Sequence, residues 1–137
     1  MQNSKKIDLT ESISINPTQL LFNYLYAAGG QTEYDKLYSD LEQIVIALKD
    51  KNIKSTAVFH GCRVDGKIRG QTISNELWYW ISNKFIEHKH EREKIFLKFS
   101  DKIKPEVQQN INWNLSENTI SILKNVMAKI IFNLALE

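Results

Sequence analysis

Hydrophobic residues recur at alternating steps of three and four positions in two long stretches of the chain, which is the pattern of amphipathic helices. In the first stretch the repeating positions are Tyr34, Leu37, Leu41, Ile44 and Leu48. A second stretch near the C-terminus repeats in the same way, at Ile120, Leu123, Met127, Ile130 and Leu134. Each stripe must be buried on one side, so the pattern predicts two helices that share a core.

A further helix is predicted by the signals at its ends. Asn16 can cap a helix, Pro17 is tolerated at the first helical position, and Gln19 can reach back as in a capping box. The pair Gly29-Gly30 ends this helix, because glycine readily adopts the left-handed conformation that closes a helix.

The stretch 74–104 leaves two alternatives open. Trp78, Ile81, Phe85, Ile95 and Phe99 keep the helical spacing, but the segment 87–94 between them is entirely polar. That gap is longer than two helical turns. The pattern therefore predicts either one long helix that leaves the core in its middle or two helices that meet near residue 90.

Between these helices, the segment 55–73 loses the helical period and contains three glycines. Its Asp65-Gly66 pair suits a tight turn between two strands, which predicts a β-hairpin, with an irregular loop as the alternative. Residues 1–15 are polar apart from a few apolar positions and are predicted to form an N-terminal arm, either disordered or an edge strand. Residues 16–137 are predicted to form a single helical domain.

Taken together, these elements predict a mainly α fold: a single-domain helical bundle of four or five helices, with a β-hairpin insertion near residues 55–73. A length of 137 residues fits one domain. Hydrophobic residues make up 42% of the chain, charged residues 25%, and glycine and proline are few, which is typical of globular proteins rather than disordered ones.

Three features of the sequence bear on the cellular location of the protein. Its longest apolar run, near the C-terminus, is interrupted by Lys129 and Asn133 and is far shorter than the roughly 20 residues that span a bilayer. The N-terminus lacks the apolar stretch of a signal peptide. Cys62 has no second cysteine with which to form an intrachain disulfide. We therefore expect a cytoplasmic protein that makes no membrane contact.

Charge is unevenly distributed. Lysine and arginine minus aspartate and glutamate gives −3 for residues 1–50 (four against seven), +6 for 51–104 (twelve against six) and −1 for 105–137 (two against three). The basic segment 51–104 indicates nucleic-acid binding as one alternative, with phosphate contacts from four cations. These are Lys54, Arg63, Lys67 and Arg69.

Two motifs with chemical content are incomplete. Residues 61–67 match the GxxxxGK spacing of a phosphate-binding loop, but Ile68 stands where Ser or Thr must hold magnesium, so we expect no nucleotide cofactor. His88 and His90 suggest a metal, yet residues two apart on a helix point to nearly opposite sides. Cys62 is the single cysteine, so no pair of thiols is present to bind a metal ion. We therefore expect no metal site.

The leading functional hypothesis is a non-catalytic small binding protein that acts through protein–protein contacts, as an adaptor, an inhibitor or a small subunit of a complex. No complete catalytic motif is visible, so an enzyme is not favoured. A metal-independent nuclease, built from His60, His88 or His90 with nearby cations, is a second alternative after nucleic-acid binding. The very apolar last helix also suggests a homo-oligomer. The expected partner-binding residues are Arg63, Lys67, Arg69, Trp78, Tyr79 and Trp80.

Overall fold

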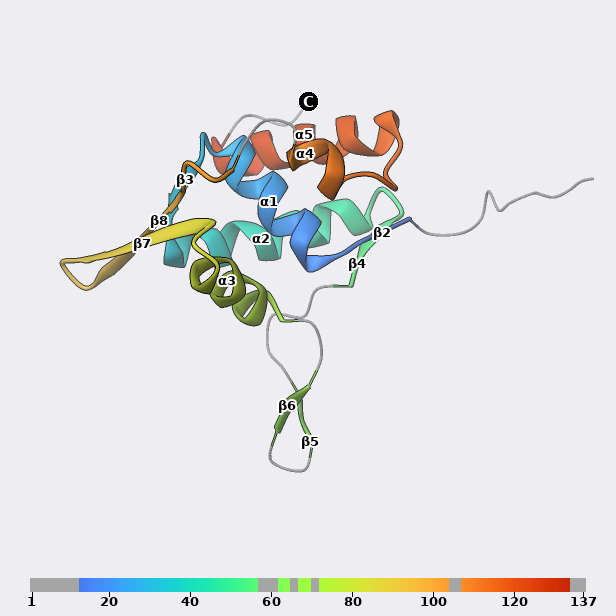
Figure 1. The fold of residues 1–137 in the computed structure, drawn as a ribbon. Helices are drawn as coiled ribbons and strands as arrows, with labels where there is room; N and C mark the ends of the chain where they lie inside the picture. Colours follow the sequence, from blue (N-terminus) through green and yellow to red (C-terminus); the bar gives the residue numbers. More distant parts are fainter. Residues whose placement is uncertain (1–12, 57–61, 65–66, 70–71, 104–106, 134–137) are drawn as a thin grey trace, which may run out of the picture.

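The computed structural model describes residues 13–56, 62–64, 67–69, 72–103 and 107–133 of the chain. Within these ranges lie five helices and seven strands, so the prediction of a mainly α bundle is wrong: the fold is mixed α+β (Figure 1). The elements are β2 (Ile13–Ile15), α1 (Pro17–Ala27), β3 (Gln31–Glu33), α2 (Tyr34–Lys49), β4 (Ile53–Ser55), β5 (Cys62–Val64), β6 (Lys67–Arg69), α3 (Ile73–Ser82), β7 (Ile86–Glu91), β8 (Lys94–Phe99), α4 (Val107–Ile111) and α5 (Glu117–Ile131).

The polar segment 87–94, which left two helical alternatives open for 74–104, lies in a β-hairpin and not in a helix. After α3 the chain forms β7 and β8, which pair antiparallel with Glu91 opposite Lys94. The two residues between them, Arg92 and Glu93, have φ angles of 52° and 67°, as a tight turn with two left-handed residues requires. Such turns usually carry Asn-Gly or Asp-Gly, and Arg92-Glu93 is therefore not recognisable as a turn from its residue types.

Strand β8 is the centre of a three-stranded antiparallel sheet with the order β3-β8-β7. Leu97 of β8 lies opposite both Thr32 of β3 and His88 of β7. One face of this sheet packs against the helices, because α2 contacts β8 and α3 contacts β7. Leu97 and Ile86 are buried on that inner face, whereas the other face is open.

Helix α1 begins and ends where the sequence predicts. Asn16 accepts a hydrogen bond from the Gln19 backbone at 2.8 Å, and the Gln19 side chain accepts one from the Asn16 backbone at 3.1 Å. Gly29 and Gly30 follow the helix with φ angles of 85° and 89°. The helix packs against α3, α4 and α5, and most of its residues are buried, so it is the centre of the core.

The first periodic stripe lies in α2, and the second lies in α5 up to Ile130, while its last member, Leu134, lies outside the described residues. Leu37, Leu41, Ile44 and Leu48 of α2 are fully buried. Helix α5 starts after Ser116, whose hydroxyl accepts a hydrogen bond from the Thr119 backbone at 3.1 Å. Its buried residues are Thr119, Leu123, Val126, Met127 and Ile131. No helix in the described ranges is both long and apolar enough to cross a membrane.

The segment 55–73 does contain a hairpin. Strands β5 and β6 pair antiparallel with Cys62 opposite Arg69 and Val64 opposite Lys67, and the Asp65-Gly66 pair between them lies outside the described residues. In Figure 1 this hairpin extends away from the helices, on the side of α3. Of the predicted N-terminal arm, residues 13–15 form strand β2, which pairs parallel with β4; residues 1–12 lie outside the described ranges.

Candidate nucleic-acid interface

Helix α3 separates its residues into an inner and an outer stripe. Ile73, Leu77 and Trp80 are buried at helical spacing. The outer stripe consists of four exposed residues, and the last three follow the first by three, four and seven positions, as one face of a helix requires. They are Asn75, Trp78, Tyr79 and Ser82. Threonine 72 caps the helix by accepting a hydrogen bond from the Asn75 backbone at 3.0 Å. The helix therefore presents a continuous polar and aromatic stripe to solvent.

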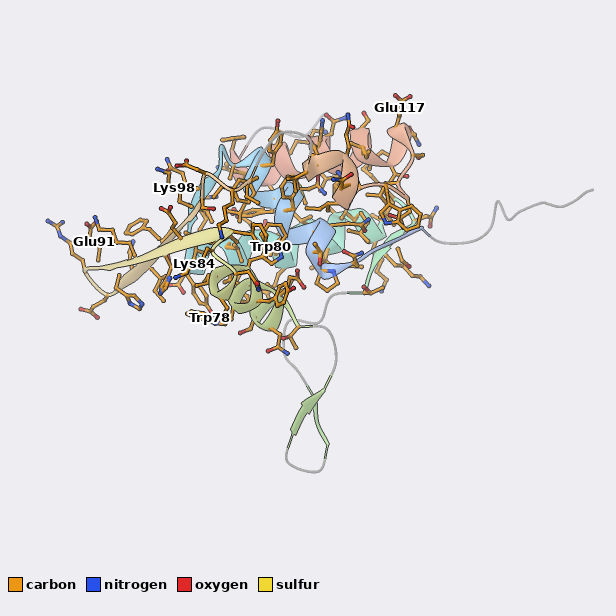
Figure 2. The ribbon with its side chains drawn as sticks, viewed as in Figure 1. Trp78, Trp80, Lys84, Glu91, Lys98 and Glu117 are labelled. Atoms are coloured by element: carbon orange, nitrogen blue, oxygen red, sulfur yellow. The ribbon has the colours of Figure 1, made fainter. Side chains whose placement is uncertain are left out.

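The three neighbouring aromatic residues predicted as a partner surface have different environments. Trp80 is only 6% exposed, and its indole nitrogen donates a hydrogen bond to Glu76 at 2.5 Å. Trp78 and Tyr79 are 42% and 63% exposed. Figure 2 shows Trp78 on the outer side of α3 and Trp80 inside the body. Only Trp78 and Tyr79 can offer their rings to a partner, because Trp80 is part of the core.

Trp78 joins the outer stripe of α3 to the β7–β8 hairpin. Its ring meets the His88 ring edge to face, with the ring centroids 5.7 Å apart. His90 follows on the same side of β7, at 5.8 Å from His88. The helical assumption placed these histidines on opposite sides, but a strand places residues two apart on one face. The aromatic surface thus continues from the helix onto the hairpin.

This pair of histidines does not by itself complete a metal site. The described residues contain no group of three or more His, Cys, Asp or Glu side chains placed to hold a metal ion. His60, the third histidine of the chain, lies outside the described ranges.

The charged residues of strands β7 and β8 lie on one face of the hairpin. On the open face, Glu87 lies opposite Lys98 and Glu91 opposite Lys94, while Lys89 lies 3.5 Å from Glu91. These carboxylates and ammonium groups balance one another. The inner face carries no carboxylate on either strand; its members are Ile86, His88, His90, Ile95, Leu97 and Phe99. Acidic residues are therefore kept away from the side of the hairpin that continues the α3 surface.

A shallow hollow of about 540 Å³ covers the open face of the sheet. Phe96 stands in its lining and is 40% exposed, with Lys89 and Glu33 directly opposite on the two neighbouring strands. Because acidic and basic side chains alternate around Phe96, the hollow has no preference for a ligand of one charge. It is a weaker candidate site than the α3 surface.

The remaining predicted cations lie in the strands that precede α3 in the chain. Arg63 is in β5, and Lys67 and Arg69 are in β6, which leads directly into α3; their side chains lie outside what the structure describes. Lys54 in β4 and Lys84, just after α3, are exposed. Figure 2 places Lys84 between α3 and the base of the β7–β8 hairpin. Asn75 and Ser82 could not be recognised as surface candidates from the sequence, since neither belongs to a motif.

Two buried polar networks hold the body behind this surface together. Asp40 accepts hydrogen bonds from the Tyr24 hydroxyl at 2.7 Å and from Lys36 at 2.6 Å, which ties α1 to α2. Burial is the main cause that raises the pKa of the Tyr24 phenol above its ordinary value. Asn23 and Asn112 exchange side-chain hydrogen bonds at 2.9 and 3.1 Å, which ties α1 to the end of α4.

Comparisons of the chain with protein-family models, with curated proteins and with solved structures found no match. Function is therefore inferred from the geometry of the molecule itself.

Proposed function

We propose that this chain binds duplex DNA, with α3 in the major groove and the β7–β8 hairpin along the sugar-phosphate backbone. The order of the elements carries this proposal. Helix α1, strand β3, helices α2 and α3 and the β7–β8 hairpin follow one another, with β4–β6 inserted before α3, and the hairpin pairs back onto β3. This order resembles that of a winged helix, a helix-turn-helix core extended by a hairpin, with β4–β6 here in place of the short turn, and in such cores the last helix enters the groove.

The exposed stripe of α3 has groups that can read base edges. Asn75 lies near the N-terminus of the helix, the end that contacts bases in helix-turn-helix proteins, and asparagine pairs well with adenine. Tyr79 and Ser82 add hydroxyl groups, and Trp78 offers an apolar surface for a thymine methyl group. A helix about 10–12 Å wide fits a major groove about 12 Å wide.

Cations that precede and follow this stripe in the chain support phosphate contacts. The chain from Lys84 to Lys98 carries five lysine or arginine residues against three glutamates, and Arg92 lies at the hairpin turn. Lys54 and the cations of β5 and β6 precede α3 in the chain. This surface lies within the basic segment 51–104. The cytoplasm expected from the sequence remains the proposed location.

The test begins with selection of bound sequences from a randomised duplex library, followed by fluorescence anisotropy on the selected duplex at several salt concentrations. We expect saturable binding whose logarithm falls linearly with the logarithm of salt, by roughly 0.9 for each phosphate contacted. Asn75→Ala should weaken binding by about 1–3 kcal/mol and relax the base preference at one position. Absence of saturable binding at low salt would overturn the proposal.

A pair of matched variants separates the site from general charge effects. Lys84→Gln removes a cation at the base of the hairpin and should lower the salt slope by about 1. Lys124→Gln removes the same charge from an exposed position of α5, on the opposite side of the body from α3, and should leave binding unchanged. Equal effects of the two substitutions would show nonspecific attraction instead of the proposed interface.

The second candidate function is the protein–protein contact expected from the sequence. Exposed tryptophan and tyrosine side chains favour it, because these residue types dominate binding hot spots. Trp78 and Tyr79 would then be the anchors, together with Arg63, Lys67 and Arg69 if their side chains lie on the same surface. Salt discriminates between the candidates, since an apolar contact keeps its affinity where phosphate contacts lose several orders of magnitude.

A further inference from the structure

Two hollows meet on the side of α3 that faces α1 and α4. The polar one, of about 340 Å³, lies between the start of α1 and the first half of α3. The second, of about 250 Å³, is mostly apolar. Both are lined by Thr18, Glu76 and Tyr79, so they form one groove, which we call the Glu76 groove. The apolar part is completed by Trp80, Phe85, Ile103, Val107 and Ile111.

Glu76 is held firmly at the junction of the two hollows. One of its carboxylate oxygens, Oε2, accepts hydrogen bonds from the Thr18 hydroxyl at 2.7 Å and from the Trp80 indole at 2.5 Å. Both donors are neutral. Among the side chains that the structure describes, no lysine, arginine or histidine lies within ion-pair distance of this carboxylate. As far as these side chains go, the groove presents a fixed negative charge without a cation.

Beside that charge stand aromatic and aliphatic surfaces. Tyr79 borders both hollows, and Trp80 and Phe85 contact each other edge to face, with their ring centroids 5.7 Å apart. Aromatic faces attract cations, and a carboxylate next to them strengthens that attraction. The polar hollow, at about 340 Å³, lies at the lower end of the range of about 300–1,000 Å³ that small-molecule sites occupy, and the apolar hollow, at about 250 Å³, lies just below it.

We propose that the Glu76 groove binds a small organic cation, with its ammonium group at Glu76 and its apolar body between Phe85 and α4. Charge complementarity selects a cation, and the apolar lining selects one with a hydrocarbon body instead of a hydrated metal ion. The groove shares Asn75 and Tyr79 with the exposed stripe of α3, but Glu76 and the apolar hollow lie on the side of α3 that faces α1 and α4. The proposed site does not depend on DNA binding.

Isothermal titration calorimetry with three probes of similar shape tests the site. Phenethylammonium carries the cation, 2-phenylethanol is neutral, and 3-phenylpropanoate is an anion. We expect saturable one-to-one binding of phenethylammonium, at least tenfold weaker binding of the alcohol, and none of the anion. Equal binding of the cation and the alcohol, or no saturable binding of the cation, would overturn the proposal.

Variants of the full chain connect binding to the groove. Glu76→Gln keeps an acceptor for Thr18 and Trp80 but removes the charge, and should weaken phenethylammonium binding at least tenfold. Glu117→Gln removes a carboxylate at the far end of the body, where Figure 2 labels it, and should leave binding unchanged. If Glu76→Gln does not fold, Ile111→Phe supplies the test by filling the apolar hollow. Unchanged binding in either groove variant would refute the assignment.

Discussion

Replacement of Trp80 by alanine tests whether α3 is oriented as described. Trp80 and Trp78 are two positions apart on the same helix, but Trp80 is 6% exposed and Trp78 42% exposed. The Trp80 ring contacts Phe22, Phe85 and Phe99, with centroid separations of 6.1, 5.7 and 6.5 Å. Its removal would leave a cavity between α1, α3 and the sheet.

The size of the effect follows from these contacts. Truncation of a buried tryptophan to alanine costs about 3–5 kcal/mol, and the lost hydrogen bond to Glu76 is included in that range at about 1 kcal/mol. For a domain of this size, such a loss lowers the melting temperature by about 10–17 °C. Trp78→Ala should cost about 1 kcal/mol or less, because it removes a half-exposed ring.

Urea denaturation followed by circular dichroism gives the free energy of unfolding of each variant. We expect a lower midpoint for Trp80→Ala with an unchanged slope, because the surface exposed on unfolding stays nearly the same. Trp80→Phe keeps most of the packing and should lose only about 1–2 kcal/mol. If Trp78→Ala destabilised the protein as much as Trp80→Ala, the orientation of α3 would be wrong.

Three further predictions follow. Burial raises the pKa of the Tyr24 phenol, which contributes stability below the ordinary tyrosine pKa of 10.0, and this contribution is lost as pH rises above that value. The free energy of unfolding should therefore fall above pH 10, and it should fall less steeply in Tyr24→Phe. Urea titrations at several pH values measure both. Replacement of Arg92-Glu93 by Asn-Gly should raise stability by about 1 kcal/mol, measured as the urea midpoint, because these residues have positive φ angles. Replacement of Arg63, Lys67 and Arg69 together by alanine should weaken DNA binding, measured by fluorescence anisotropy. The melting temperature of this variant should stay within about 2 °C of that of the unchanged protein.

Local signals in the sequence were sufficient for α1, α2 and α5. The capping box at Asn16 and the hydrophobic stripes of α2 and α5 each depend on residues within a few positions of one another. Such signals do not need the rest of the chain, which is why the ends of α1 and the presence of α2 and α5 could be predicted. The β5–β6 hairpin was indicated in the same way, by Asp65-Gly66.

The β7–β8 hairpin could not be found by these means. Ile95 and Phe99 are four positions apart, so they fit a helical stripe, but with Leu97 between them they also fit the period of two of a strand with one buried face. The preceding strand, β7, is exposed from Glu87 onwards and shows no period at all. Pairing with β3, more than 50 residues earlier, decides the outcome, and no local pattern records it.

This difference in secondary structure changes the functional argument. On a helix, the glutamates and lysines of 87–94 would neutralise one another around a solvated surface, and the two histidines would diverge. The strand instead places Glu87 and Glu91 on the open face, opposite Lys98 and Lys94, and places His88 and His90 together beside Trp78. The same composition then gives one balanced face and one face free of carboxylates that adjoins α3. Nucleic-acid binding, which the helical pattern made the weaker alternative, becomes the better supported proposal for this reason.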